Sequence, residues 1–366
     1  MKKLKLLLLG CLILGASPVF CQEDDLTPAE IQYRDSIAAL NETNAAVARS
    51  QEAYNKGITF FQEKNYKAAI QQFKTSIEAD PNFTAAFYNK GVVENEDNQF
   101  NEAAKTLSSL IAKKQNYAKA YFQRGRAFQG MNNYLAAEKD YKTAIELDAT
   151  NPKSYYNFGT LQFLQQNYEE AIVSFTKTIE LDNNMAFAYN DRGSSYRMKG
   201  NYAKALADYE EAVKRNPNLA FVLNNIGTTK KKMKNYDAAI ASFNRAISLD
   251  GKFYLAYANR GATQMAKGRI DDAINDFKKC LTIEPKYALA YNNLAAAFLK
   301  KKQYQEALDA ANKAINIDKS YASAYVNRGL AKEMLRDMNG ACEDWEKAKD
   351  LGSETGNSYY AQNCGM

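Results

Sequence analysis

The chain has 366 residues and a formal net charge of +6, with 25% charged and 46% hydrophobic residues, values that are ordinary for a globular protein. It contains no histidine, so the commonest general base and the commonest metal ligand are missing from any mechanism assigned to it. Three lysines lie in a leader that we expect to be removed, and the remaining charge of about +3 is too small for strong nonspecific binding of nucleic acid.

Residues 1–21 have the pattern of a secretory signal peptide, with a basic start, an apolar run from Leu6 to Leu14 and a less apolar end at Cys21. The apolar run is shorter than the roughly 20 residues that span a bilayer. Cleavage before Gln22 is the favoured site. No lipobox precedes Cys21, so a lipid anchor or a retained helix is the less favoured alternative. We therefore expect an exported protein of the periplasm or the bacterial cell envelope.

Residues 22–49 predict a helix that starts near Thr27. Thr27 is a suitable N-cap, Pro28 fits the first helical position, and Glu30 can reach back to complete a capping box. Apolar side chains of this helix are expected to cover the open end of the array that follows: Ile31, Ile37 and Leu40.

From Ser50 to Thr355 one pattern returns every 34 residues, nine times and without an insertion. Eight units carry a glycine at the same place, and Ala295 takes that place in the remaining unit. The glycines are Gly57, Gly91, Gly125, Gly159, Gly193, Gly227, Gly261 and Gly329. Twelve places later every unit carries an alanine: Ala69, Ala103, Ala137, Ala171, Ala205, Ala239, Ala273, Ala307 and Ala341. This regularity predicts a repeat array with one continuous core.

Each unit predicts two antiparallel helices, because apolar residues recur at helical spacing in both halves, as from Tyr168 to Phe175. The joint between the halves holds turn or polar residues, for example residues 199–201. Several second helices are followed by a proline such as Pro81 or Pro217, which cannot continue a helix.

Two sets of aromatic residues are expected to form the core of the array. A glycine inside a helix costs about 1 kcal/mol relative to alanine, so close contact between the paired helices must offset it. One set of aromatics covers the joints: Tyr66, Tyr134, Tyr168, Tyr202, Tyr236 and Tyr304. The other set fills the space between neighbouring pairs: Phe73, Tyr141, Phe175, Tyr209, Phe243, Phe277 and Trp345.

These residues resemble the signature of the tetratricopeptide repeat family. In the fifth unit the signature places are Tyr189, Gly193, Tyr196, Tyr202, Ala205, Tyr209, Ala212 and Pro217. The resemblance implies an all-α fold, a right-handed superhelical solenoid of nine tandem 34-residue helix-turn-helix repeats over residues 50–355. Residues 22–49 would then be an N-terminal capping helix, and residues 356–366 a C-terminal cap.

The resemblance also implies a concave groove lined by the first helices, through the second, fifth, ninth, twelfth and thirteenth places of each unit. Aromatic fifth places make up its N-terminal part, and amides in its middle could hydrogen-bond an extended peptide. The candidate groove residues are Tyr54, Phe61, Tyr88, Phe122, Arg126, Tyr156, Phe163, Asn190, Arg197, Asn224, Lys231 and Asn292. A partner with apolar residues at one end and acidic residues further along would complement them. Further nearby cations are Lys119, Lys153, Lys232 and Lys300.

The alternative for these groove residues is a structural role, since tyrosine and asparagine at such places are also common in idealised repeats of the family. Runs of lysine that end first helices, such as residues 230–232, are interpreted as solvated helix ends favoured by the helix dipole.

The cysteines lie in three different contexts. Cys11 and Cys21 belong to the leader, and Cys280 takes a place that usually holds alanine. Cys342 and Cys364 flank the predicted C-terminal cap. We hypothesise a disulfide between them, which would close a loop of 23 residues. In an oxidising compartment such a bond contributes about 3 kcal/mol.

The predicted function is a noncatalytic scaffold that binds a protein or peptide segment in its groove. Repeats occupy nearly everything outside the leader and the caps, and residues 22–49 are too few for a catalytic domain. No phosphate loop, nucleophile elbow or metal-ligand spacing occurs, so no catalytic residue, cofactor, metal, nucleic acid or small-molecule substrate is expected. Association with membrane complexes of the envelope is a further hypothesis. The alternatives are a recruiting or regulatory arm of an enzyme complex, and a purely structural spacer with an empty groove.

Overall fold

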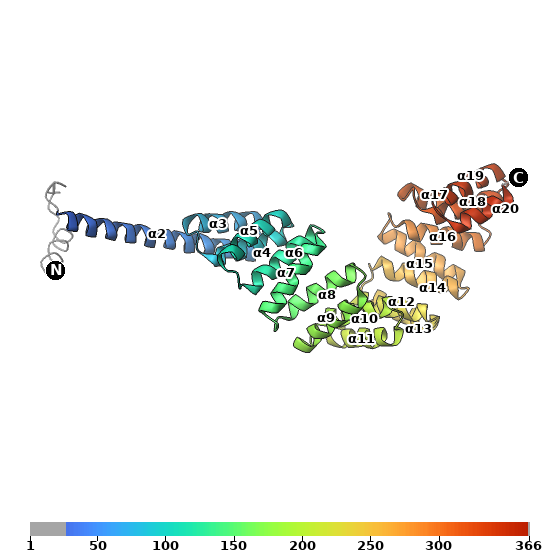
Figure 1. The fold of residues 1–366 in the computed structure, drawn as a ribbon. Coiled ribbons are helices and arrows are strands. Elements are labelled where there is room, and N and C mark those ends of the chain that lie inside the picture. The colour runs from blue at the N-terminus through green and yellow to red at the C-terminus, as the bar shows by residue number, and fades with distance from the viewer. Residues whose placement is uncertain (1–26, 365–366) are drawn as a thin grey trace. The chain divides into compact units, whose positions relative to one another are not determined.

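The computed structural model describes residues 27–364, and every regular element in that part of the chain is an α-helix (Figure 1). The chain divides into two compact units, residues 1–133 and residues 134–366, so the boundary falls between the two helices of the third repeat. The predicted leader and its cleavage before Gln22 lie outside the described residues. Among the described helices, none combines the length and the apolar composition needed to cross a membrane.

The first unit contains the helices of the first two repeats and the first helix of the third. Short turns join the two helices of each pair, which pack against each other. The helices are α2 (Pro28–Gln62), α3 (Tyr66–Ala79), α4 (Thr84–Glu96), α5 (Phe100–Lys113) and α6 (Ala118–Gly130).

The second unit continues the same pattern to the end of the described chain, and its all-helical repeats confirm the predicted fold class. It begins with α7 (Tyr134–Leu147), the second helix of the third repeat. Six helix pairs and a final helix follow: α8 (Pro152–Leu164), α9 (Tyr168–Leu181), α10 (Ala186–Met198), α11 (Tyr202–Arg215), α12 (Ala220–Lys232), α13 (Tyr236–Leu249), α14 (Tyr254–Ala266), α15 (Ile270–Ile283), α16 (Ala288–Lys300), α17 (Tyr304–Ile317), α18 (Ala322–Met334), α19 (Met338–Asp350) and α20 (Glu354–Asn363).

The recurring glycine makes room for the aromatic residue of the second helix. A Cβ atom on Gly57 would lie 2.7 Å from the ring of Phe73, and one on Gly227 would lie 2.5 Å from the ring of Phe243. Separations this short require the ring to move. The aromatics predicted to fill the space between helix pairs are all fully buried: Phe73, Tyr141, Phe175, Tyr209, Phe243, Phe277 and Trp345.

The joints inside the helix pairs share a left-handed backbone conformation. Gly200 and Gly268 adopt φ values of 78° and 79°, which glycine tolerates without strain. Gln166 and Lys302 adopt φ values of 64° and 60° at the equivalent joints, although they carry side chains. The turn geometry of the repeat is therefore kept even where its preferred residue is absent.

The first helix begins as the sequence predicts. The Glu30 backbone N–H donates to Thr27 Oγ1 at 3.4 Å, and the Thr27 N–H donates to Glu30 Oε2 at 3.0 Å, which completes the capping box. The helix does not end before the first repeat, because no glycine or proline interrupts residues 29–56. The expected cap and the first repeat helix thus form one helix of 35 residues. Ile37 and Leu40 are 40% and 54% exposed, so they do not cover the end of the array as we expected.

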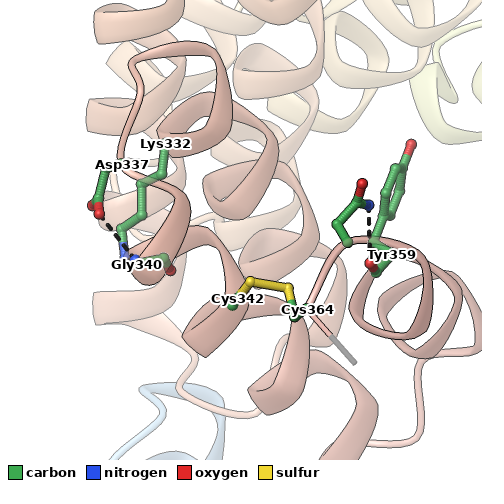
Figure 2. The surroundings of a disulfide bond; sticks show 7 residues. Lys332, Asp337, Gly340, Cys342, Tyr359 and Cys364 are labelled. Carbon is green, nitrogen blue, oxygen red and sulfur yellow. Dashed lines mark hydrogen bonds between the residues drawn. A yellow bond between two sulfur atoms is a disulfide. The ribbon is translucent and has the colours of Figure 1, made fainter. Parts of the chain in front are cut away.

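The C-terminal helix α20 is tied to the helix before it. Figure 2 shows the disulfide between Cys342 in α19 and Cys364 at the end of α20, with the two Cα atoms 5.7 Å apart. This is the pair expected from the sequence. The ring of Tyr359 also stacks on that of Trp345, with the centroids 5.2 Å apart. The last helix therefore covers the buried tryptophan of the ninth repeat.

A buried ion pair recurs in every second repeat of the second unit, a pattern that the sequence analysis missed. In the seventh repeat Arg260 Nε and Nη2 donate to the two carboxylate oxygens of Asp276 at 2.8 and 2.6 Å, and Nη1 reaches Asn244 of the preceding repeat. The eighth repeat has Leu294 and Ala310 at the places of the pair. The equivalent pairs in the fifth and ninth repeats are Arg192 with Asp208 and Arg328 with Asp344.

Candidate functional site: the inner face of the first helices

The first helices form the inner layer of each unit. In the second unit α8, α10, α12, α14, α16 and α18 contact one another in succession, and in the first unit α4 contacts α6. The second helices of neighbouring repeats make no comparable contact within the described chain. Because a curved two-layer stack brings the elements of its inner layer closer together, the first helices line the inner face, as the resemblance implied.

On this face a row of asparagines joins neighbouring repeats, and we call it the amide ladder. Asn225 Nδ2 donates to Asn190 Oδ1 at 3.0 Å, and Asn259 Nδ2 donates to Asn224 Oδ1 at 2.9 Å. The third rung of the ladder pairs Asn327 Nδ2 with Asn292 Oδ1 at 2.8 Å. In each rung the acceptor lies at the fifth place of one repeat and the donor at the sixth place of the next.

The ladder differs from the expectation that these amides are open to a partner. Asn190, Asn224 and Asn292 are each less than a tenth exposed, and their carbonyl oxygens are occupied by the next repeat. These amides are therefore part of the packing between repeats and are largely shielded from a bound peptide. The signal for the ladder was present at the sixth places, where every unit has an amide or an acid: Asn55, Asn89, Gln123, Asn157, Asp191, Asn225, Asn259, Asn293 and Asn327.

A tyrosine and an aspartate form the N-terminal rung in the second unit. The Tyr156 hydroxyl donates to Asp191 Oδ2 at 2.8 Å, and Asn190 Nδ2 donates to Asp191 Oδ1 at 2.8 Å. Burial raises the pKa of Asp191, although both of these hydrogen bonds act in the opposite direction. Burial, and then the charge of Asp191, also raise the pKa of Tyr156. The predicted groove residue Tyr156 is therefore engaged inside the unit.

The aromatic candidates of the first unit also make internal contacts. The Tyr54 hydroxyl accepts a hydrogen bond from Asn89 Nδ2 at 2.7 Å, and the Tyr54 ring lies 4.9 Å from that of Phe83. The ring of Tyr88 meets Tyr117 edge-on at 5.6 Å. Both tyrosines stay partly exposed. A further aromatic candidate is buried: Phe122.

Phe61 and Phe163 lie near the joints rather than along the middle of the inner face. Phe61 packs against Tyr66 with the ring centroids 6.1 Å apart, and Phe163 meets Tyr168 edge-on at 5.5 Å. Each of these pairs connects the end of a first helix with the start of its second helix. The two phenylalanines therefore support the joints of their repeats.

The cationic candidates have different surroundings. Both Nη atoms of Arg126 donate to Glu96 at 3.1 Å, and Arg197 Nε donates to the Tyr209 hydroxyl at 3.3 Å. Lys231 is half-buried, and its pKa is lowered first by burial and second by the neighbouring lysine. Within the described residues no carboxylate pairs with Arg197 or Lys231. An anionic group brought next to Lys231 would relieve this unfavourable environment.

A row of large apolar side chains lies beside the ladder, and we call it the apolar row: Phe187, Phe221, Leu255 and Leu289. These residues hold the second place of four successive repeats, three positions before the fifth place, so they lie on the same helix face as the ladder. Phe187 is 48% exposed and Leu289 is 42% exposed. The rings of Phe187 and Phe221 stack, with their centroids 5.9 Å apart. The second place was among the expected groove places, but most of the candidate residues hold the fifth place.

No arrangement for metal chemistry stands out between residues 27 and 364, where no three Cys, Asp or Glu side chains are grouped to hold a metal ion. Cys280, the free cysteine of this part of the chain, is buried, and burial raises its pKa to about 12. Its thiol is therefore protonated and poorly reactive at neutral pH.

Models of the tetratricopeptide repeat match residues 60–127, 118–151, 140–173, 184–252 and 254–320, which together exceed half of the chain. The chain belongs to the tetratricopeptide repeat family. Tetratricopeptide repeat proteins are typically noncatalytic scaffolds, and the repeats of this chain support a role as a protein–protein interaction scaffold.

Several solved structures share the fold of this tetratricopeptide repeat protein. One from Parabacteroides merdae is 22% identical, with a TM-score of 0.55 over 68% of this chain and 99% of its own. The C-terminal part of a repeat protein from Cytophaga hutchinsonii is 19% identical, with a TM-score of 0.53 over 66% of this chain and 98% of its own. PilF of Pseudomonas aeruginosa is 20% identical, with a TM-score of 0.52 over 58% of this chain and 97% of its own. These identities show the fold alone, and no curated protein matches the sequence.

Proposed function

We propose that this tetratricopeptide repeat protein is a noncatalytic scaffold of the bacterial cell envelope that binds an extended peptide or protein segment along the inner face of its second unit. The apolar row carries the proposal. Phe187 and Leu289 remain about half exposed on helices whose neighbouring amides are already paired. A set of exposed apolar side chains gathered on one face is typical of an interaction site.

The side chains around the row define the chemistry of the partner. Arg197 and Lys231 lie on the same first helices without carboxylate partners, and Lys153 and Lys300 lie exposed on α8 and α16. An extended segment with apolar side chains for the row and acidic side chains for these cations fits best. The other groove candidates contribute mainly by holding the first helices in position.

Binding of short synthetic peptides, measured by fluorescence anisotropy, tests the proposal. We expect peptides with two apolar residues and nearby acidic residues to bind more tightly than peptides of the same length with only polar or basic residues. The double change Phe187→Ala and Leu289→Ala should weaken this binding about tenfold or more, because truncating apolar anchors costs 1 to 2 kcal/mol or more.

The control removes a more exposed apolar side chain from a second helix. Val173 in α9 is 69% exposed, so Val173→Ala should leave peptide affinity unchanged. If the control variant loses as much affinity as the double variant, the apolar row is not the site. If no peptide binds at all, the chain acts as a spacer and the proposal fails.

Location in the envelope rests on the predicted leader and on the disulfide, which persists in oxidising compartments. Cell fractionation followed by thiol counting before and after reduction tests it. We expect the protein in the envelope fraction with Cys342 and Cys364 bridged and Cys280 free. Retention in the cytoplasm, or free thiols at both bridged positions, would contradict the proposed location.

A further inference from the structure

The first part of α2 buries none of its residues against the other helices of residues 27–364. The other first helices have 13 residues each, whereas α2 has 35 and extends past the helices it packs against (Figure 1). The buried residues of α2 start only at Ser50. Residues 28–49 therefore project from the first unit as a helix in which no residue is buried by the rest of the described chain.

One stripe of this projecting helix is apolar. Tyr33, Ile37, Leu40 and Val47 are each 40% to 54% exposed. With Asn44 they follow alternating spacings of four and three residues, which is the spacing of the d and a positions of a coiled-coil heptad. Ile37 and Asn44 hold the a positions, and the other three hold d positions.

The rest of the helix agrees with this heptad. Asp35, Glu42 and Arg49 are seven residues apart and hold the f positions, opposite the apolar stripe. In residues 33–49 the e and g positions, which flank the stripe, carry one charged residue, Arg34. In a parallel pair of identical helices Arg34 would face Ala29, so no like charges would oppose each other.

We propose that two copies of this chain associate through a parallel two-stranded coiled coil formed by residues 33–47 of α2. Isoleucine at position a with leucine at position d favours two strands, and a single asparagine at position a fixes the register by pairing with its counterpart. Asn44 therefore specifies a second copy of the same helix rather than an arbitrary apolar surface. This inference does not depend on the peptide-binding role of the second unit.

The length of the stripe sets the strength of the association. The stripe covers about 20 Å at 1.5 Å per residue, so the dimer dissociates on dilution. Association does not have to form the helix first, because Ser50, Ala53 and Gly57 anchor its C-terminal part in the first repeat. This preorganisation lowers the entropic cost of pairing.

Sedimentation velocity of the full mature chain at increasing concentration tests the proposal. We expect a shift from one chain to two, and the double change Ile37→Asp and Leu40→Asp should raise the dimer dissociation constant at least tenfold. Ala39 and Glu42 lie off the stripe and are exposed, so Ala39→Asp with Glu42→Lys should leave the dissociation constant unchanged. Circular dichroism shows whether each variant stays folded.

A disulfide trap tests the parallel register. Asn44→Cys should form a covalent dimer under mild oxidation, whereas Glu42→Cys, on the opposite face, should not. Among the described residues the native cysteines are either buried or already bonded, so they do not compete. A single chain at every concentration overturns the proposal, and so does equal cross-linking from both positions. A monomer that instead holds a different protein on this stripe also overturns it.

Discussion

The amide ladder and the apolar row lie on the same inner helices, three residues apart, and differ in exposure. The ladder residues Asn190, Asn224 and Asn292 are at most 8% exposed, whereas Phe187 and Leu289 of the row are more than 40% exposed. This reverses the usual arrangement of a folded protein, because here the polar side chains are buried and the apolar side chains face solvent. The amides are hydrogen-bonded between repeats, whereas Phe187 and Leu289 keep almost half of their surface in contact with solvent.

This contrast shows that position on the groove face does not define a binding residue. A buried asparagine whose side-chain oxygen accepts a hydrogen bond from the next repeat stabilises the stack. Removing either the donor or the acceptor would leave the other buried group unpaired, which is costly. An exposed phenylalanine adds little to folding but can exclude water when a partner covers it. The inner face therefore combines residues that join the repeats with residues that bind.

The largest expected effect concerns a group that joins the repeats. Asp276→Ala leaves Arg260, which is 20% exposed, without its carboxylate, and should lower the free energy of unfolding by about 3 kcal/mol in urea denaturation. Peptide affinity should not change under native conditions. Adding Arg260→Leu reproduces the apolar residues of the eighth repeat and should recover much of the lost stability. If the single variant is as stable as the parent chain, the pair does not stabilise the stack.

A smaller loss is expected from the ladder. Asn224→Ala removes the acceptor of Asn259 and should lower the free energy of unfolding by about 1 to 2 kcal/mol. The seventh repeat offers the reverse change, because Ala258 holds the fifth place and Asn293 makes no side-chain hydrogen bond within the described chain. Ala258→Asn should therefore add a rung and raise stability. In urea denaturation, a loss of stability in Asn224→Ala together with a gain in Ala258→Asn would support the ladder. Changes in the same direction for both variants would contradict it.

The Tyr156–Asp191 rung predicts a pH dependence. Burial raises the pKa of Asp191, so the folded state binds its proton more tightly than the unfolded state. Its contribution to stability is present below the ordinary aspartate pKa and is lost as pH rises through the raised one. Asp191→Asn should make the protein more stable than the parent at neutral pH, and the difference should shrink on acidification. Parallel stability curves for the two proteins from pH 4 to pH 7 would contradict the assignment.

The smallest expected effect separates stability from binding. Gln166 has a φ of 64°, where glycine is favoured, so Gln166→Gly should raise the free energy of unfolding by about 0.5 to 1 kcal/mol. It lies in a joint, away from the ladder and the row. Thermal unfolding should show the gain, while peptide affinity stays the same. If peptide affinity also rose, binding would depend on stability, and the amide ladder and the apolar row could not be assigned separate roles.

The sequence predicted the fold because the small residue of most units has a large partner sixteen residues later, as Gly227 has Phe243, and this spacing is visible in the sequence itself. The capping box at Thr27 involves neighbouring residues and was predicted for the same reason. The amide ladder was not predicted, because its bonds join residues 35 apart and depend on how neighbouring repeats pack. The length of α2 was also missed, since the predicted boundary followed the repeat and the residues around it have no helix breaker.

Site-specific photo-crosslinking in the native host tests the central claim most directly. A photoreactive phenylalanine analogue is placed at Phe187 in the apolar row or at Val173, which is more exposed and lies on a second helix. If the apolar row is the binding site, the analogue at position 187 should cross-link one reproducible partner, and the analogue at position 173 should cross-link none. The cross-link from position 187 should disappear when Leu289 is changed to alanine. Equal cross-linking from both positions, or a partner found only from position 173, would contradict it.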